Sequence, residues 1–338
     1  MNTDPLIIAG EEVKPGTRAT IQIPVARRYT AGDVALPVRV VHGRKPGPRL
    51  FVSAAVHGDE INGVEIIRRL LRQSVLKQMR GALIAVPIVN VYGFIAQTRY
   101  LPDRRDLNRC FPGSSKGSLG ARLANTFLQE VVEKATHGID LHTGSMHRSN
   151  LPQLRASLAE PGVEELARSF GAPVIIDAEL RPGSLRQAVS VLGVPIIVYE
   201  AGEALRFDEL AIKAGLRGVL SVMRSLDMLP ASKSQRRPVE PFVAHGSTWI
   251  RAPESGILVS QLTVGARIEK GQRLGAVSDP LGTEETQVVA PTSGVLIGRT
   301  NLPLVNEGDA LFHVAVFEKL DTAADEVDYF QGVHDPPT

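Results

Sequence analysis

The sequence lacks several features that define common classes of protein. It has a single cysteine, Cys110, which excludes an internal disulfide and a cysteine-rich zinc site and fits a reducing compartment. No apolar run approaches the roughly 20 residues of a membrane-spanning helix, and no basic segment at the N-terminus precedes a long apolar one. We therefore expect a soluble, cytoplasmic protein without a membrane partner.

The chain also lacks an excess of charge of either sign. Its 338 residues include 38 Lys and Arg against 36 Asp and Glu, so no broad basic surface is available to bind phosphate backbones, and nucleic acid is not an expected partner. No Walker-type or dinucleotide glycine motif follows a predicted strand, which argues against a nucleotide cofactor. With 43% hydrophobic residues, the chain can bury a large core, and its length favours two domains.

Strand and helix patterns alternate over residues 1–232. Two segments between Thr20 and Val41 are rich in β-branched residues and predict opening strands. Residues 50–56 are continuously apolar, and residues 63–73 then place apolar side chains at helical spacing. Similar alternation continues to residue 226. Strands buried on both faces and interleaved with helices predict an α/β domain with a mixed, largely parallel sheet flanked by helices.

The pattern changes after residue 232. Residues 233–240 are polar and proline-containing, which is typical of a linker. Residues 241–320 then contain two similar stretches, each with A-P-x-S-G near its start and a glycine turn before its last strand. Two copies of one short β unit predict a small all-β barrel or sandwich closed by pseudo-twofold pairing. Residues 321–338 form an acidic tail.

Three polar segments are predicted at one edge of the sheet. The segment HGDE, which contains His57 and Glu60, follows the apolar strand 50–56, and His142 follows the strand GIDL. Because ligands bind outside the carboxyl ends of parallel strands, these side chains can share one site. A lone H-G-x-E is more often a solvated loop, and a lone histidine is often a core residue. Because these side chains are predicted at the same edge of the sheet, a His2Glu metal site is favoured instead. This set of ligands is one that binds zinc and leaves one coordination position open.

A carboxylate completes this edge. Glu200 ends the predicted strand PIIVYE, and a carboxylate beside a buried strand is costly unless it has a partner or a task. Near a metal-activated water, that task is general base catalysis. The alternative is an ordinary hydrogen-bonded glutamate, and Glu203 is the rival for the catalytic role. Asp59 has no role that the sequence supports.

A loop rich in cations lies between the predicted strands. Its arginines could form a solvated basic surface, but clustered guanidinium groups also suit carboxylate recognition, and Asn108 would add an amide donor. The sequence does not choose among Arg99, Arg104, Arg105 and Arg109. Residues 113–117 fit G-x-S-x-G but do not follow a buried strand, so a serine hydrolase is not expected.

Four ordered motifs, HGDE, RDLNRCFPG, IDLHTG and VYEAG, resemble those of the succinylglutamate desuccinylase/aspartoacylase family of zinc-carboxypeptidase-like amidohydrolases. The resemblance covers roughly residues 35–320 and implies a zinc-carboxypeptidase-like fold with one zinc ion per chain. By position it implies zinc ligation by His57, Glu60 and His142, general acid/base catalysis by Glu200, substrate carboxylate binding by Asn108 and Arg109, orientation of the first zinc histidine by Asp106, and polarisation of the scissile carbonyl by Arg99.

The implied activity is zinc-dependent hydrolysis of an N-acyl amino acid or a related N-acylated amine, a small-molecule substrate. A carboxypeptidase acting on peptides and a non-catalytic metal- or metabolite-binding protein are the alternatives. Arg148 and Arg155 are further candidates for substrate contact. The resemblance also implies that the C-terminal β unit shapes substrate access. A homo-oligomer is a further expectation, because symmetric assemblies are common among soluble enzymes.

Overall fold

The computed structural model describes residues 4–27, 29–232, 237 and 239–334. Residues 233–236 and 238 of the expected linker lie outside the described residues, as do residues 335–338 of the expected tail. Within the described part of the chain, no helix is long and apolar enough to cross a membrane.

The chain begins with antiparallel strands. Strands β1 (Leu6–Ile8) and β2 (Glu11–Val13) form a small separate hairpin, and β3 (Arg18–Arg27) pairs with β4 (Asp33–His42). Alternate residues of β3 and β4, among them Ile21, Ile23 and Leu36, are buried, as the two-residue period of a strand with one covered face requires. The predicted opening strands are therefore present, and they extend one edge of the main sheet.

The centre of the sheet is parallel. Strand β5 (Lys45–Ala54) pairs in parallel with β6 (Arg80–Val86) and β7 (His137–Gly144), and β7 pairs in parallel with β10 (Ile196–Glu203). Beyond β10 the sheet becomes mixed, because β8 (Arg148–Ala156) is antiparallel to β10. Strand β9 (Val174–Asp177) follows in parallel and also pairs with β11 (Phe242–Ala244). Strand β8 is absent from the sequence prediction.

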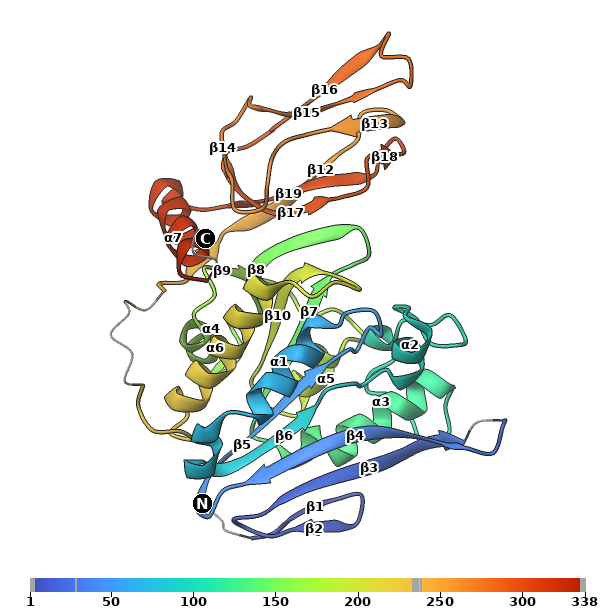
Figure 1. The fold of residues 1–338 in the computed structure, drawn as a ribbon, viewed down its shortest axis with the longest axis vertical. Helices are drawn as coiled ribbons and strands as arrows, with labels where there is room; N and C mark the ends of the chain where they lie inside the picture. The colour runs from blue at the N-terminus through green and yellow to red at the C-terminus, as the bar shows by residue number, and fades with distance from the viewer. Residues whose placement is uncertain (1–3, 28, 233–236, 238, 335–338) are drawn as a thin grey trace.

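Helices cover both faces of this sheet (Figure 1). Helices α1 (Asn62–Leu71), α4 (Val163–Phe170) and α6 (Glu209–Ser225) share one apolar core with the sheet. Helices α3 (Leu119–Glu130) and α5 (Leu185–Val191) share the core of the other face, beside the short α2 (Val91–Ala96). Single 3-10 turns lie at Ser74–Gln78, Leu107–Arg109 and Val132–Lys134. The expected mixed α/β fold is confirmed.

The C-terminal β unit is built from two similar halves. The first half contributes β12 (Gly246–Arg251), β13 (Gly256–Val259), β14 (Arg267–Ile268) and β15 (Arg273–Ser278). The second half contributes β16 (Glu285–Val289), β17 (Gly294–Thr300), β18 (Leu304–Val305) and β19 (Ala310–Val316).

The two halves exchange strands. Strand β12 pairs with β19 of the other half, and the equivalent β16 pairs with β15. Strand β13 likewise pairs with β18, and the equivalent β17 pairs with β14. Each layer of the unit therefore contains strands of both halves, with an apolar core that includes Ile250, Leu274 and Phe312. This exchange is the pseudo-twofold pairing that the repeated sequence predicts.

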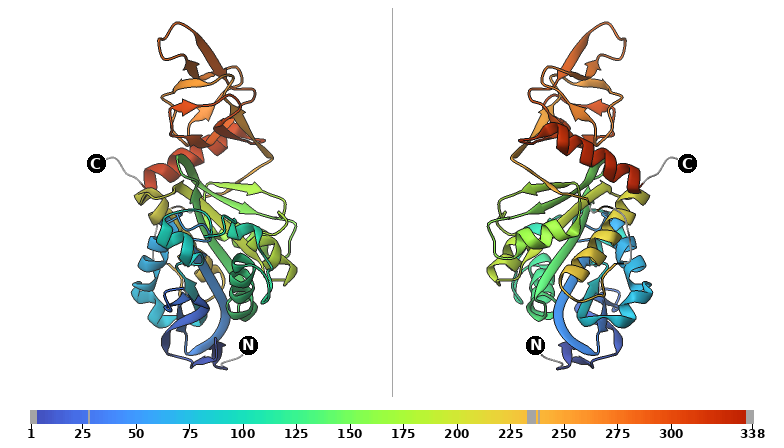
Figure 2. Two further views of the ribbon diagram at one scale, coloured as in Figure 1. Left: turned by 90° about the vertical axis from the view of Figure 1, so that its right-hand side faces the viewer. Right: turned by 90° about the vertical axis from the view of Figure 1, so that its left-hand side faces the viewer.

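The C-terminal β unit is joined to the α/β body through the main sheet. Strand β17 pairs with β8, so one layer of the unit continues the sheet. Residues expected as an acidic tail form helix α7 (Leu320–His334), whose Phe330 is buried in the core that α6 also covers. Figure 2 shows α7 running between the β unit and the α/β body.

Two of the expected site residues lie inside strands. His142 was expected after the strand GIDL and Glu200 at the end of the strand PIIVYE, but β7 continues to Gly144 and β10 continues to Glu203. Hydrogen bonding between the two strands extends past the apolar segments, and it places Glu200 directly beside His142 in the parallel register. The paired backbones of β7 and β10 therefore fix the positions of His142 and Glu200.

Candidate active site

A cavity of about 720 Å³ opens at the carboxyl ends of the parallel strands. Residues from the loops after β5 and β6 and from β7, β8 and β10 line it, and the C-terminal β unit adds Ser247, Trp249 and His313. The cavity contains His57, Glu60, Arg99, Asn108, Arg109, His142 and Glu200. The structure therefore brings together residues from sequence segments more than a hundred positions apart.

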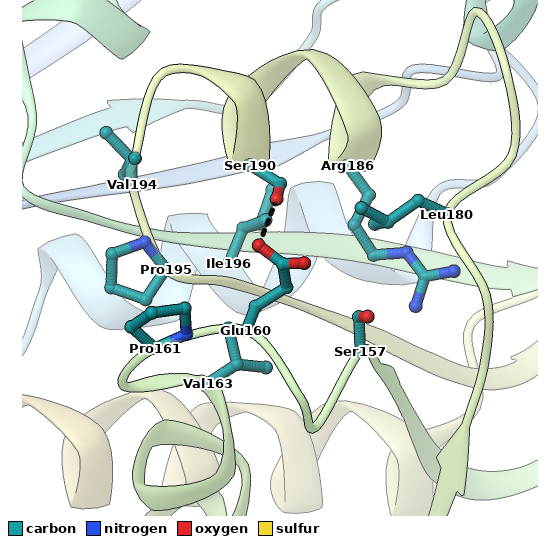
Figure 3. A pocket seen from close by; sticks show the side chains of 11 residues that line it. Ser157, Glu160, Pro161, Val163, Leu180, Arg186, Ser190, Val194, Pro195 and Ile196 are labelled. Atoms are coloured by element: carbon teal, nitrogen blue, oxygen red, sulfur yellow. Dashed lines mark hydrogen bonds between the residues drawn. The ribbon is translucent and has the colours of Figure 1, made fainter.

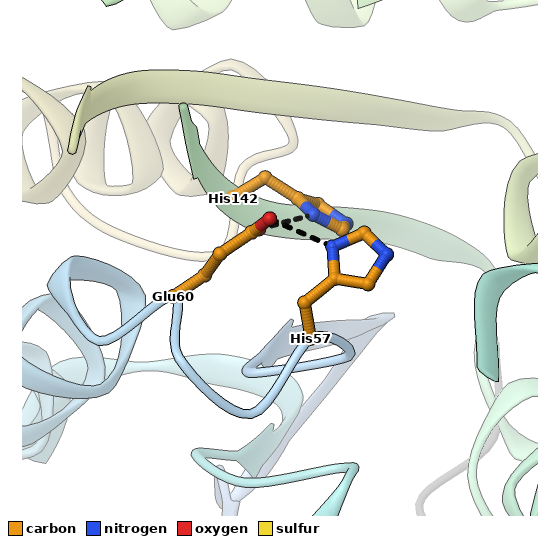
Figure 4. Close-up of side chains that lie close together, drawn as sticks. All are labelled: His57, Glu60 and His142. Carbon is orange, nitrogen blue, oxygen red and sulfur yellow. Dashed lines mark hydrogen bonds and ion pairs between the residues drawn. The ribbon is translucent and has the colours of Figure 1, made fainter. Parts of the chain in front are cut away.

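Three buried side chains at the base of this cavity could hold a metal ion. His57, Glu60 and His142 each offer one ligand atom, and these atoms lie within 4.8 Å of one another. The Nδ1 atoms of His57 and His142 each lie 2.7 Å from a different carboxylate oxygen of Glu60 (Figure 4). A carboxylate between two imidazole nitrogens is a donor set that suits zinc, with room for a further ligand.

The turn after β5 depends on a glycine. The backbone N–H of Glu60 donates to the His57 carbonyl at 3.1 Å, which closes a tight turn. A Cβ atom on Gly58 would lie only 1.9 Å from the Gly93 carbonyl carbon, so any side chain would collide with the backbone of α2. Gly58 therefore permits the close approach that presents His57 and Glu60 together.

Each imidazole is also held by a second carboxylate. His57 Nε2 lies 3.1 Å from Asp106 Oδ1, and His142 Nε2 lies 2.7 Å from Asp140 Oδ2. A carboxylate on the outer nitrogen directs Nδ1 toward the metal position and increases its basicity. Asp140 also accepts a hydrogen bond from the Ser53 hydroxyl at 2.7 Å.

The electrostatics of this cluster suit a bound cation. Burial alone would lower the pKa of His57 and His142, but the surrounding carboxylates raise both pKa values. Burial would likewise raise the pKa of Glu60, yet the two imidazoles hold it well below its usual range. A divalent cation can replace the protons that the inner nitrogens share with Glu60, because metal ligands bind in their deprotonated forms.

Arg99 lies beside the same cluster. Its guanidinium group donates to Asp106 Oδ2 at 3.0 Å and to Glu60 Oε1 at 3.3 Å. These two carboxylates raise the pKa of Arg99 although burial opposes the shift. Arg99 thus places a permanent positive charge at the edge of the candidate metal site.

Glu200 lines the same cavity, with a polar side chain beside each of its carboxylate oxygens. Oε1 lies 3.0 Å from Arg155 Nε, and Oε2 accepts a hydrogen bond of 3.2 Å from Asn150 Nδ2. Glu203 is not among the residues that line the cavity, and it instead accepts hydrogen bonds from the His147 backbone and the Asn301 side chain. The geometry therefore favours Glu200 over Glu203 as the carboxylate that meets a substrate.

Only part of the arginine-rich loop reaches the cavity. Arg99 and Arg109 line it, whereas Arg104 and Arg105 do not. Asn108 accepts a hydrogen bond of 2.9 Å from the Leu185 backbone through its amide oxygen, which leaves its NH2 group to donate to a ligand. Asp59 is buried, its Oδ1 lacks a hydrogen-bond partner among the described residues, and burial and the Glu60 charge raise its pKa.

Several cavity residues are missing from the sequence prediction. Asp140 precedes His142 by two positions, and residues two apart in a strand lie on the same face of the sheet. This spacing could have identified Asp140 as a neighbour of His142. Trp249 and His313 gave no such signal, because only the docking of the β unit brings them to the cavity. Their rings stack with centroids 4.5 Å apart, and the Arg148 guanidinium lies 5.2 Å from the indole centroid. Burial, with the nearby Arg155 charge, lowers the pKa of His313 to about 3.

A second, smaller cavity has a volume of about 60 Å³, and Figure 3 shows the side chains that line it. Leu180 and Arg186 line both cavities and therefore form the wall between them. Inside the smaller cavity, the Ser190 hydroxyl donates to Glu160 at 2.7 Å. Its volume suits one or two water molecules at most, so the larger cavity is the candidate substrate site.

Comparisons with known proteins find relatives over most of the chain. Residues 46–226 match the model of the succinylglutamate desuccinylase/aspartoacylase catalytic domain. The chain is 26% identical over 310 residues to the N-alpha-acetyl-L-2,4-diaminobutyric acid deacetylase of Halomonas elongata, covering 87% of this chain and 90% of that protein. It is 27% identical over 221 residues to a succinylglutamate desuccinylase of Pseudomonas aeruginosa, covering 60% of this chain but only 65% of that protein.

Solved structures have the same fold. A crystal structure of succinylglutamate desuccinylase/aspartoacylase from Rhodobacter sphaeroides superposes with a TM-score of 0.78 at 25% identity, covering 89% of this chain and 96% of that one. The product-bound ectoine utilization protein EutE (DoeB) from Ruegeria pomeroyi also gives a TM-score of 0.78, at 23% identity, covering 89% of this chain and 95% of that one. At that identity the second likeness concerns the fold alone.

Proposed function

Because the chain belongs to the succinylglutamate desuccinylase/aspartoacylase family and is an amide-bond hydrolase, we propose that it removes the acyl group from an N-acylated amino acid or a related N-acylated amine. The observation that carries this proposal is the convergence of His57, Glu60 and His142 at the base of a large cavity that also contains Glu200. The named activities of the two curated relatives are both removals of an acyl group from an amino acid nitrogen.

Zinc is the proposed cofactor, one ion per chain. His57, Glu60 and His142 would hold it, and their outer carboxylates Asp106 and Asp140 support the two imidazoles. When bound, zinc supplies a Lewis acid for the amide carbonyl and lowers the pKa of water.

The remaining chemistry belongs to side chains. Glu200 takes a proton from the attacking water and afterwards delivers a proton to the departing amine. The Arg99 guanidinium group stabilises the negative charge that develops on the carbonyl oxygen. Asn108 and Arg109 bind the substrate carboxylate, for which a planar guanidinium group and an amide donor are well suited. The products are a carboxylic acid and a free amine.

The C-terminal β unit contributes to the same proposal. We propose that residues 1–232 form the catalytic domain and that residues 241–320 form a β domain, continuous with the main sheet through β17, that completes the cavity. Ser247, Trp249 and His313 supply part of the cavity wall, so the unit would take part in substrate selection directly.

The test is a hydrolysis assay on zinc-loaded protein with N-acetyl and N-succinyl amino acids, N-acetylated diamino acids and short peptides. We expect release of free amine from at least one acylated amino acid, and a loss of about 10²- to 10⁴-fold in kcat for Glu200→Gln. Preferential release of C-terminal residues from peptides would instead identify a carboxypeptidase. Stoichiometric metal without hydrolysis of any compound would identify a non-catalytic binding protein.

A further inference from the structure

We propose that Arg155 and Asn150 of strand β8 are positioning residues for Glu200, and that strand β17 of the C-terminal β unit keeps Asn150 in place. This inference rests on the proposed function, because it gives Glu200 the role of general base. It assigns the C-terminal β unit an effect on catalysis in addition to its contribution to the cavity wall.

The contacts at Glu200 carry the first step. Arg155 Nε lies 3.0 Å from one carboxylate oxygen as an ion pair, without the alignment of a hydrogen bond, and Asn150 Nδ2 donates to the other oxygen at 3.2 Å. The side chain of Glu200 is 20% exposed and that of Arg155 is 26% exposed, so water screens this ion pair less than it would at an open surface. Contacts on both oxygens restrict rotation of the carboxylate and define the direction in which it meets a substrate.

An irregularity in strand pairing makes this arrangement possible. Arg155 and Asn150 are five residues apart, so a regular strand would direct their side chains to opposite faces. The register between β8 and β10 shifts between Glu200 and Gly202, and Asn150 and Arg155 both line the cavity. Bulges of this kind redirect side chains beside functional sites.

The link to the C-terminal β unit is Gly298. It pairs with Asn150 across β17 and β8. A Cβ atom at Gly298 would lie 2.9 Å from Asn150 Oδ1 and 3.3 Å from His313 Cβ. The missing side chain therefore provides the space in which the Asn150 amide lies. A side chain at this position has to shift that amide, and the shift would weaken its hydrogen bond to Glu200.

The experiment compares steady-state kinetics of zinc-loaded Arg155→Met, Asn150→Leu and Gly298→Ala with the wild type, using the best substrate from the hydrolysis assay. Because misplacing a reacting group by about 1 Å can cost 10²-fold, we expect kcat to fall about 10- to 100-fold in Arg155→Met. We expect smaller losses in the other two variants and a KM within about threefold of wild type in all three. Arg155→Lys should recover part of the loss, because it keeps the charge.

Two controls separate positioning from structural damage. Gly246→Ala alters a glycine of β12 whose added Cβ would meet nothing within 4 Å, and it should retain wild-type kcat. Arg155→Met should also bind one metal ion per chain and unfold at a temperature close to that of the wild type. These readouts do not depend on turnover.

The decisive comparison uses the Glu200→Gln background. If Arg155 acts through Glu200, adding Arg155→Met to Glu200→Gln causes no further loss of kcat. Full additivity of the two losses, or wild-type kcat in Arg155→Met, would overturn the inference while leaving the proposed function intact. Absence of turnover by the wild-type protein on every acylated compound would overturn both.

Discussion

Replacing Asp140 by asparagine tests whether the buried carboxylate behind His142 supports metal binding. Asp140 is 1% exposed, with Oδ2 2.7 Å from His142 Nε2 and Oδ1 2.7 Å from the Ser53 hydroxyl. An asparagine has one carbonyl oxygen in place of two carboxylate oxygens. If that oxygen faces His142, the imidazole keeps its orientation but loses the charge that increases its basicity.

If the NH2 group of the asparagine faces His142 instead, Nε2 must accept a hydrogen bond. The imidazole proton then moves to Nδ1, the nitrogen that faces Glu60 and the metal position. We therefore expect Asp140→Asn to weaken zinc binding about 10- to 100-fold, which corresponds to about 1.4 to 2.7 kcal/mol. The first orientation gives the lower value and the second gives the higher value.

The assay is a competition titration of zinc between the protein and a chromophoric chelator at pH 7. The matched control is Asp103→Asn, which neutralises an exposed aspartate whose cationic contact is Arg105 at 3.5 Å, and which should leave zinc affinity unchanged. If the Asp140→Asn protein is folded and its zinc dissociation constant stays within twofold of wild type, the Asp140 carboxylate does not strengthen zinc binding through His142 and the prediction is wrong.

Three further predictions concern stability. Gln153 is fully buried and neither of its side-chain amide atoms has a hydrogen-bond partner among the described residues, so Gln153→Leu should raise or preserve the melting temperature; a fall of several degrees would contradict this. Hydrogen bonds from Arg68 and Arg69 lower the pKa of Glu65 to about 2, below the ordinary 4.5, so this stabilisation is present above pH 4.5 and is lost as the pH falls toward 2. In Glu65→Gln, the free energy of unfolding measured by urea denaturation should therefore change less between those pH values than in the wild type. A pH dependence equal to that of the wild type would contradict this. Gly58→Ala should cost about 1 to 3 kcal/mol in thermal unfolding, because its Cβ would lie 1.9 Å from the Gly93 carbonyl carbon; wild-type stability would show that the turn can relax.

The sequence was most informative where strand and helix periodicity is strong. Buried parallel strands are continuously apolar, so β5, β7 and β10 could be predicted, and their carboxyl ends indicated one edge of the sheet for the candidate site. Strand β8 could not be predicted in the same way. Its sequence RSNLPQLRA mixes polar residues with proline, because residues such as Asn150 and Arg155 face a polar cavity. The pattern that identifies a buried strand is therefore absent where the strand lines the site.

The repeated C-terminal sequence shows a similar limit. Pseudo-twofold pairing could be predicted from two copies of A-P-x-S-G, because both halves need the same turns and the same apolar positions. The features that the two halves share could not predict which layer of the unit contacts the α/β body. That choice is made by the pairing of β17 with β8, a contact between distant parts of the chain.

The two halves differ where one of them meets the cavity. Trp249 pairs with His313 across β12 and β19, and the equivalent pair across β16 and β15 is Gln287 with Ala276. The strand framework is the same at both places, but only the first pair lines the cavity. A large stacked pair therefore occupies the position that faces the cavity, while a glutamine and an alanine occupy the position that does not. Since the framework does not require a tryptophan or a histidine there, substrate contact is the physical reason that best accounts for the difference, and Trp249 and His313 are the residues of the C-terminal β unit through which we expect selectivity to be changed.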